Sequence, residues 1–315
     1  MIKHEGKVDD SAKKTLLSQL KALDKIKEGD VPAHPPQLVA GNRQHPEAMP
    51  EDIAALSHAD GGSLKPQNSS TQLTEAVLEA ARSTTMSPDK KAQAVYRHSL
   101  DLFSGLFETP TAEFIKNSKK AVGGVVDMIL EDDDTAINLL KVTSHDFYTY
   151  THSVNVGVLS VCLAKQLFKG KSSHNLREFG AGAFLHDLGK VKVDPAILNK
   201  PGRLDDWEMK RMRIHPYQSY RILMDTSQLS EECAIIAMQH HEREDGTGYP
   251  LRLKGKEIHE YGKIGCIADV YDALTAKRSY KEGMPPFKAL QIMKEEMIHH
   301  FEKEIFQNFV LLFSK

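Results

Sequence analysis

The chain has 315 residues, of which 41 are Lys or Arg and 43 are Asp or Glu, and its formal net charge is −2. A nearly neutral chain has no general attraction for nucleic acid polymers or anionic membranes, so local cations would have to bind any anionic ligand. The longest apolar stretches, CAIIAM and NFVLLF, are far shorter than the roughly 20 residues of a membrane span, and the N-terminus lacks a signal-peptide core. Cys162, Cys233 and Cys266 each lie in an apolar helical run, which is typical of buried thiols in a reducing compartment. We therefore expect a cytoplasmic protein without disulfide bonds.

Residues 1–85 have a sequence pattern of their own. Apolar residues at helical spacing in 10–28 favour a short amphipathic helix, which could pair with a second chain in a homodimer. Six prolines and three glycines interrupt residues 31–70 and favour loop or extended structure. Helical patterning resumes at 71–83. Two interpretations stay open for this region, a small regulatory or dimerisation domain and a partly disordered tail.

Residues 86–315 are predicted to form one all-α domain. Ser87-Pro88-Asp89 is a good helix start, because proline is favoured at the first helical position. Helix follows helix from there, and strand patterns are nearly absent, so the ligands of any site should lie on facing helices. A chain beginning near Ser83 is therefore expected to keep the fold. Breaks are predicted at Thr109-Pro110, Gly170-Lys171, 195–202, 246–250 and Met284-Pro285-Pro286.

The most informative features are two adjacent pairs, His186-Asp187 in FLHDLGK and His240-His241 in AMQHHEREDGTGYP. The first pair offers one imidazole and one carboxylate, and the two carboxylate oxygens can bridge two metals. Neighbouring helix positions are about 100° apart, so both imidazoles of the second pair can reach one ion. The two pairs together predict a metal centre.

Other residues extend this set: His152 in HSVNVGVLSVCLAKQLF, His215 in RIHPYQSY, and Asp269 in KIGCIADVYDALTA with Asp272 one turn later. Taken singly, His152 reads as a hydrogen-bonded core residue, His215 as a helix-boundary residue, and each aspartate as a solvated or capping residue. Their joint occurrence with the two pairs favours metal binding instead.

These motifs resemble the HD-GYP domain, a branch of the HD metal-dependent phosphohydrolase superfamily. The resemblance runs from about Lys90 to the C-terminus and includes GTGYP at 246–250 and ADVYDALTAKRSY at 268–280. It implies an HD-type helical bundle with two divalent ions. One ion would be held by His152, His186, Asp187 and Asp269, and the other by Asp187, His215, His240 and His241.

Five histidines and two aspartates are mixed nitrogen and oxygen ligands that suit Fe, Mn or Zn. Seven ligand residues are more than one ion needs, whereas two ions bridged by Asp187 would be coordinated by all seven. Two ions about 3.5–4 Å apart can hold a bridging hydroxide as nucleophile and bind phosphoryl oxygens. Some members of the family carry a third metal on a Glu one turn before the first histidine; Tyr148 occupies that position here and favours a binuclear site. His299-His300 lies outside the family motifs, and we interpret it as surface or packing.

Four residues are candidates for binding substrate. Lys190 follows the HD pair, where a cation could meet a phosphate oxygen. Arg278 and Lys281 come in the order that the family uses for phosphate contacts, although Ser279 replaces the family's frequent proline. The alternative interpretation is that each of these three side chains is only a solvated surface charge. Tyr249 lies in a predicted tight turn, where it could pack on a base, hydrogen-bond a phosphate or be an ordinary turn residue.

The resemblance implies hydrolysis of cyclic di-GMP to linear pGpG or GMP in bacterial signalling, with a metal-bridging hydroxide attacking phosphorus. Asp187, Lys190 and Asp272 are the expected catalytic residues, and Asp272 could orient the nucleophile or a substrate hydroxyl. One alternative is a non-catalytic cyclic di-GMP receptor that signals to a protein partner through the GYP loop; the complete ligand set argues against it. Another is a general HD nucleotide phosphohydrolase, against which GTGYP and AKRSYK argue.

Overall fold

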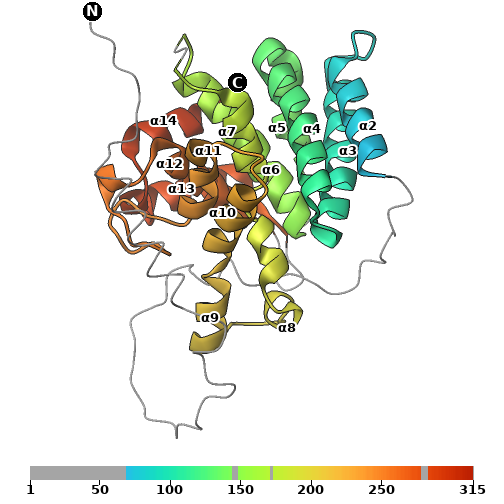
Figure 1. Ribbon diagram of the computed structural model, residues 1–315. Helices are drawn as coiled ribbons and strands as arrows, with labels where there is room; N and C mark the ends of the chain where they lie inside the picture. The colour runs from blue at the N-terminus through green and yellow to red at the C-terminus, as the bar shows by residue number, and fades with distance from the viewer. Residues whose placement is uncertain (1–68, 144–147, 171–172, 278–282, 315) are drawn as a thin grey trace, which may run out of the picture.

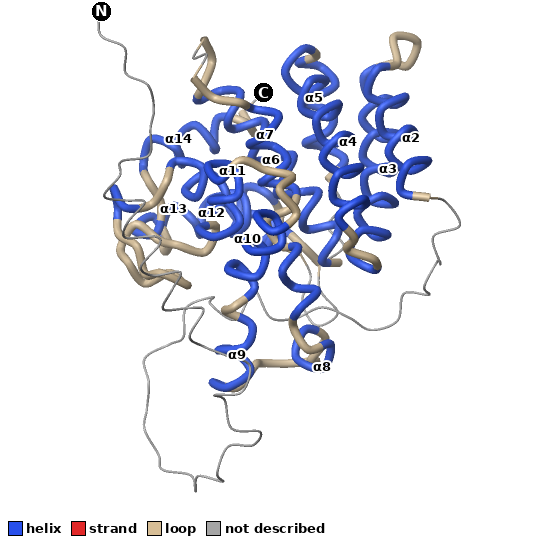
Figure 2. The backbone as a smooth tube through the Cα atoms, viewed as in Figure 1, coloured by secondary structure: helices blue, strands red, loops and turns tan. Residues whose placement is uncertain are grey.

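The computed structural model describes residues 69–143, 148–170, 173–277 and 283–314. All regular elements within these ranges are helices (Figure 1, Figure 2), which confirms the predicted all-α fold. The expected helix at 10–28 and nearly all of the Pro/Gly-rich stretch 31–70 lie outside the described residues. None of the helices that are described combines the length and apolar character of a bilayer span.

Four helices form one side of the molecule (Figure 1). As predicted, one of them has Pro88 in its first turn after the N-cap Ser87, and it ends just before Thr109-Pro110. These helices are α2 (Ser70–Arg82), α3 (Pro88–Glu108), α4 (Ala112–Glu131) and α5 (Asp133–Val142).

The helix α2 is part of the packed core. Val77 is fully buried, Leu78 is 2% exposed, and the Thr74 hydroxyl donates a hydrogen bond to a backbone carbonyl of α4. Ser69 and Gln72 close a reciprocal capping box that marks the start of the helix. Among the described residues, the helical unit thus includes α2, which lies ahead of the expected boundary at residue 85. A chain beginning near Ser83 would lack this helix, contrary to the expectation that it keeps the fold.

The central element is α6 (Thr149–Leu167), whose residues from Thr151 to Ala164 are all buried. A helix that is covered on every side belongs in the middle of a domain. The neighbouring helices α7 (Leu176–Phe184) and α12 (Glu260–Thr275) pack directly on it. Gly157 permits this approach, because a Cβ atom there would lie 2.2 Å from the Phe184 ring.

The elements not yet described come after α7 in the chain. The pair α8–α9 extends away from the other helices (Figure 1) around a small apolar cluster of its own. The predicted interruptions are present at Gly170, which has a φ of +78°, and before Pro286. The three cysteines are buried and free, as expected. These elements are η2 (Leu188–Lys192), α8 (Pro195–Leu198), α9 (Asp206–Met212), α10 (His215–Asp225), α11 (Glu231–Gln239), η3 (Gly255–Glu257), α13 (Pro286–Glu295), η4 (Ile298–His300) and α14 (Lys303–Leu311).

Candidate metal centre

The seven expected metal ligands come together from five helices or helix ends. They come from α6, the turn between α7 and η2, the start of α10, the end of α11, and α12. Six of the side chains are at least nine-tenths buried, and His241 is 11% exposed. In chain order these residues are His152, His186, Asp187, His215, His240, His241 and Asp269.

Asp187 stands between two groups of ligands. Its Oδ2 lies 3.4 Å from Nε2 of His152 and 3.5 Å from Nε2 of His186. Its Oδ1 lies 3.2 Å from Nε2 of His215 and 3.7 Å from Nε2 of His240. The two oxygens of one carboxylate thus face the two groups that the family resemblance assigns to separate ions. This arrangement is the one that a bridging carboxylate requires.

Asp269, on α12, contacts one histidine of each group. Its Oδ1 is 2.9 Å from His152 Nε2, and its Oδ2 is 3.4 Å from His241 Nδ1. Within each of two trios, the potential ligand atoms lie within 4.8 Å of one another; the trios are His152, His186 and Asp269, and His215, His240 and His241. A third trio, His186, Asp187 and His240, joins the two groups, as expected for ligands that converge on one centre.

Backbone carbonyls fix the orientation of three of these imidazoles. The Nδ1 atoms of His186, His215 and His240 lie 2.7–2.9 Å from the carbonyl oxygens of Ala183, Met212 and Ala237. A carbonyl only accepts, so each Nδ1 must carry the proton and each Nε2 presents a lone pair. Outer hydrogen bonds of this kind set the tautomer of metal-binding histidines. The three rings are thus prepared to coordinate through Nε2.

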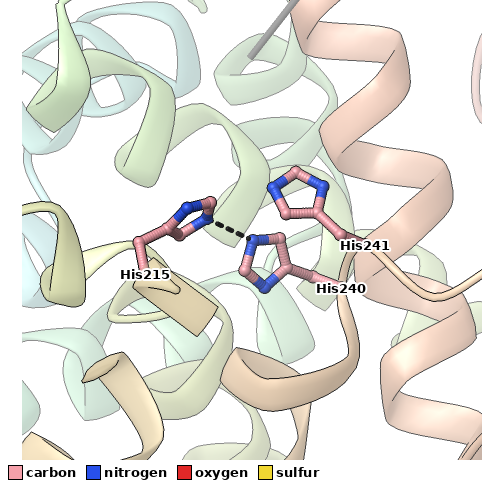
Figure 3. A group of neighbouring side chains, drawn as sticks. All are labelled: His215, His240 and His241. Atoms are coloured by element: carbon pink, nitrogen blue, oxygen red, sulfur yellow. Dashed lines mark hydrogen bonds between the residues drawn. The ribbon is translucent and has the colours of Figure 1, made fainter. Parts of the chain in front are cut away.

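The contact between His215 and His240 fits the presence of a cation. Their Nε2 atoms are 3.3 Å apart, and Figure 3 shows the two rings facing each other beside His241. Two lone pairs at this distance repel unless a proton or metal ion lies between them. In addition, Nε2 of His186, Nε2 of His241 and Oδ1 of Asp187 are buried without a hydrogen bond. Buried polar atoms normally have partners, so this donor set fits metal ions.

The electrostatics favour the ligand forms of His186, Asp187, His240 and His241. Burial lowers the pKa of His186, and lowers those of His240 and His241 far below the usual value, which keeps the rings neutral. Burial alone would raise the pKa of Asp187, but Lys190 and His186 outweigh it and hold that pKa well below its ordinary value. For His152, burial is outweighed by the hydrogen bonds to Asp269 and Asp272, and the pKa is raised to about 9. The two carboxylates thus attract positive charge to the centre.

Asp272 lies behind His152. Its Oδ2 is 2.7 Å from His152 Nδ1, and its Oδ1 accepts a hydrogen bond of 2.7 Å from Asn155. Asn155 in turn accepts a 2.7 Å hydrogen bond from the Tyr96 hydroxyl on α3. Both oxygens of Asp272 are therefore engaged by the protein, which favours an indirect role, in orienting His152, over direct contact with nucleophile or substrate.

The turn between α7 and η2, which carries His186-Asp187, is packed tightly against α10. Gly189 donates a 2.7 Å hydrogen bond to the Ser219 hydroxyl, and a Cβ atom at Gly189 would lie 2.2 Å from the His215 carbonyl oxygen. Lys190, the next residue, is 4% exposed, and its Nζ donates to Asp187 Oδ2 at 2.7 Å. The expected substrate-binding cation thus lies directly beside the central carboxylate.

The GTGYP segment forms the expected tight turn. Gly246 has a φ of +79°, and Asp245 accepts hydrogen bonds from both the amide and the hydroxyl of Thr247. The Tyr249 ring lies 4.6 Å from the His241 ring between centroids, with the Arg213 guanidinium 5.2 Å from its centre. Burial and the charge of Asp269 raise the Tyr249 pKa well above its usual value, so its hydroxyl stays protonated and can donate.

Sequence reasoning missed three residues that support the centre, namely Asn155, Arg213 and Glu242. Glu242 is 1% exposed and accepts the amides of Leu251 and Leu253 at 2.6 and 2.9 Å, so it holds the chain after the turn. Burial raises its pKa to about 7. Two features of the sequence could have indicated these roles. Glu242 directly follows the His-His pair, and Asn155 lies one turn after His152. Arg278 and Lys281 lie outside the described residues.

The arrangement around Asp272 leads to a testable expectation. Replacing an outer hydrogen-bond partner of a metal ligand weakens metal affinity or activity by roughly 10- to 100-fold. We expect Asp272→Asn to weaken metal binding by this amount, measured by competition with a chromophoric chelator. Asp127→Asn, in an exposed pair with Arg177, is the matched control. Unchanged metal affinity with lost turnover would instead favour direct contact of Asp272 with the reacting groups.

A family model described as an HD domain matches residues 134–305. The match covers more than half of the chain and includes all seven ligands, and therefore the chain belongs to the HD domain family. The pairs at 186–187 and 240–241 together with GTGYP place it in the HD-GYP branch. A solved structure of an HDG"Y"P protein from Bdellovibrio bacteriovorus has the same fold, with a TM-score of 0.63 over 78% of each chain and 20% identity.

Several curated proteins are similar in sequence. The chain is 40% identical over 182 residues to a cyclic di-GMP phosphodiesterase of Pseudomonas aeruginosa and 37% identical over 205 residues to a 3'3'-cGAMP-specific phosphodiesterase of Vibrio cholerae. It is 34% identical over 188 residues to a cyclic di-GMP phosphodiesterase of Thermotoga maritima. These alignments cover 58%, 64% and 58% of this chain and 43%, 44% and 50% of the relatives, so the chain spans half their length or less.

Proposed function

We propose that the chain is a metal-dependent phosphodiesterase that hydrolyses cyclic di-GMP to linear pGpG, GMP or both. The observation that carries this proposal is the position of Asp187, whose two oxygens face two separate groups of histidines. The names of the relatives in Pseudomonas aeruginosa and Thermotoga maritima support the choice of substrate. Three buried cysteines without a disulfide support a cytoplasmic location.

Two divalent ions fit the donor set. His152, His186 and Asp269 would hold one, His215, His240 and His241 the other, and Asp187 would bridge them. Mixed imidazole and carboxylate ligands favour Fe or Mn, with Zn as an alternative. Bound ions would supply Lewis-acid charge to the phosphoryl group and lower the pKa of water.

The chain's own groups would bind and orient the phosphodiester. The Lys190 ammonium lies at the centre and would contact a non-bridging phosphate oxygen. The Tyr249 ring covers His241, so its hydroxyl would donate to a phosphate or its face would pack on a base. Water then forms a new bond to phosphorus and gives up a proton, and the bond to O3′ breaks as O3′ takes up a proton. The hydrogen bond that His152 donates to Asp272 keeps His152 in place.

An activity assay distinguishes this function from its alternatives. The full chain, loaded with Fe²⁺ or Mn²⁺, would be incubated in parallel with cyclic di-GMP, 3'3'-cGAMP and nucleoside triphosphates, and the products separated by chromatography. We expect linear pGpG or GMP from cyclic di-GMP. Binding without turnover would favour the receptor, preferred turnover of triphosphates a general phosphohydrolase, and preferred turnover of 3'3'-cGAMP the specificity named for the Vibrio cholerae relative.

Arg278 and Lys281 remain the proposed phosphate contacts outside the described residues. A charge-assisted hydrogen bond is worth about 1.5–3 kcal/mol, or roughly a tenfold to hundredfold change in affinity. We expect Arg278→Ala and Lys281→Ala each to weaken binding of a phosphorothioate analogue of cyclic di-GMP by this factor in calorimetry. Metal content should not change, because neither side chain is an expected ligand. Lys288→Ala, an exposed lysine on α13, is the control. Unchanged affinity in both variants would remove these residues from the site.

A further inference from the structure

A further group of ligand-type side chains lies apart from the seven residues of the candidate centre. Asp245 opens the GTGYP turn, and His299 and His300 form the end of η4 between α13 and α14. Nε2 of each histidine lies 3.8 Å from Asp245 Oδ2. One potential ligand atom from each of the three residues lies within 4.8 Å of the others. The side chain of His299 is 53% exposed and that of His300 is 5% exposed, which fits the interpretation of this pair as surface or packing residues. That interpretation does not include Asp245, which both histidines approach.

A hydrogen-bonded Asp-His pair does not account for this geometry. A separation of 3.8 Å exceeds the range of a hydrogen bond. The Nδ1 atom of His300 is also buried and without a hydrogen-bond partner. A buried ring nitrogen left in this state carries a desolvation cost, so the described residues do not fully satisfy the His300 ring.

The backbone holds the three side chains in place. The Glu244 amide donates a 3.0 Å hydrogen bond to the His300 carbonyl, which joins the start of the turn to η4. Asp245 Oδ1 accepts two hydrogen bonds from Thr247, and this fixes the carboxylate with Oδ2 toward the histidines. The two imidazole rings are adjacent, with centroids 4.2 Å apart. Preorganised side chains of this kind lower the cost of binding a ligand.

We propose that Asp245, His299 and His300 form a separate binding site for a divalent transition-metal ion of the Zn²⁺ type. Two imidazole nitrogens and one carboxylate oxygen suit Zn²⁺ and its neighbours, whereas Mg²⁺ and Ca²⁺ prefer oxygen ligands. Ligands about 2.0–2.2 Å from one ion stand about 3.3–3.6 Å apart at the tetrahedral angle. The two His–Asp separations of 3.8 Å therefore need movements of only a few tenths of an ångström, and every separation in the trio is within 4.8 Å before an ion binds. Water would complete the coordination on the exposed side of His299.

Such an ion would tie η4 to the segment that carries Tyr249. Asp245 and Tyr249 belong to the same turn, and the Tyr249 ring packs on His241 of the candidate centre. The ion would therefore reinforce the backbone link between the turn and η4. This role does not depend on which reaction, if any, the candidate centre performs.

Zinc titration of the full chain tests the proposal. The protein would be freed of metal with a chelator and titrated with Zn²⁺ against a chromophoric competitor. We expect His299→Ala to bind one Zn²⁺ equivalent fewer per chain than wild type, and His299→Cys, which offers a thiolate, to restore it. His98→Ala is the matched control, because His98 lies 3.9 Å from Asp101 on α3 as a simple His-carboxylate pair. Asp187→Ala should keep the equivalent that His299→Ala loses.

The side chain of His299 is 53% exposed, so its replacement should leave the core intact, and circular dichroism would verify this. Equal zinc stoichiometry in wild type and His299→Ala would overturn the proposal and leave an electrostatic Asp-His contact only. An equal loss in His98→Ala would overturn it too, because the zinc would then be bound by surface histidines in general. Neither measurement involves turnover, so its outcome is separate from that of the phosphodiesterase assay.

Discussion

Asp187→Ala is expected to remove hydrolysis and the binding of at least one metal ion. The side chain is 1% exposed, and its two oxygens face both groups of histidines, so its loss removes a ligand atom from each group. Lewis-acid stabilisation is worth several kcal/mol, and each 1.4 kcal/mol is about a tenfold change in rate, so turnover should fall by about a thousandfold or more. Elemental analysis and the cyclic di-GMP assay measure the two effects.

The variant also leaves Lys190 buried without its partner, which is itself destabilising. Asp187→Asn keeps the size of the side chain and a hydrogen-bonding oxygen, and it separates loss of the metal from loss of the fold. Asp134→Ala, on the exposed face of α5, is the control for handling and loading. At most one ion in reconstituted wild-type protein would contradict the binuclear assignment.

Removal of α2 is expected to have the largest effect on stability. A chain beginning at Ser69 should fold and retain metal, whereas one beginning at Ser83 should aggregate or lose its cooperative unfolding transition. The difference is the burial of Leu73, Val77 and Leu78. Burial of an aliphatic side chain stabilises by about 1.5–3 kcal/mol, so three of them account for much of the roughly 5–15 kcal/mol that holds a typical domain folded. Size-exclusion chromatography and urea denaturation measure the outcome.

Point variants in the full chain test the same contact without truncation. Leu78 lies on Gly124 of α4, where a Cβ atom would come within 2.5 Å of Leu78 Cδ2. Leu78→Ala should lower the free energy of unfolding by about 2–5 kcal/mol, whereas Thr71→Ala, exposed on the same helix, should have little effect. A stable chain from Ser83, with a small effect of Leu78→Ala, would restore the boundary expected from the sequence.

The expected boundary at residue 85 and the packing of α2 differ for a physical reason. Apolar spacing predicted a helix at 71–83, and the structure has α2 over Ser70–Arg82, so the local element was predictable. The helix belongs to the core because Leu78 meets Gly124, a contact between positions far apart in the chain. Periodicity reports which face of a helix is apolar and does not report what covers that face.

The same distinction between local sequence pattern and tertiary contact applies to the candidate metal centre. Residue types, their spacing and the family resemblance led to five histidines and two aspartates as candidate ligands, and helical periods predicted an all-α fold, because these are local properties of the sequence. The placement of Asp272 behind His152 was decided by the packing of α6 on α12 and could not be seen in the spacing of the two aspartates. The common partner of His299 and His300 was likewise hidden, because η4 meets the GTGYP turn only in three dimensions. By itself, the sequence determined which chemical groups are available and on which helices they lie. The tertiary structure alone decided which of them meet, because convergence of buried side chains depends on contacts between helices that are distant along the chain.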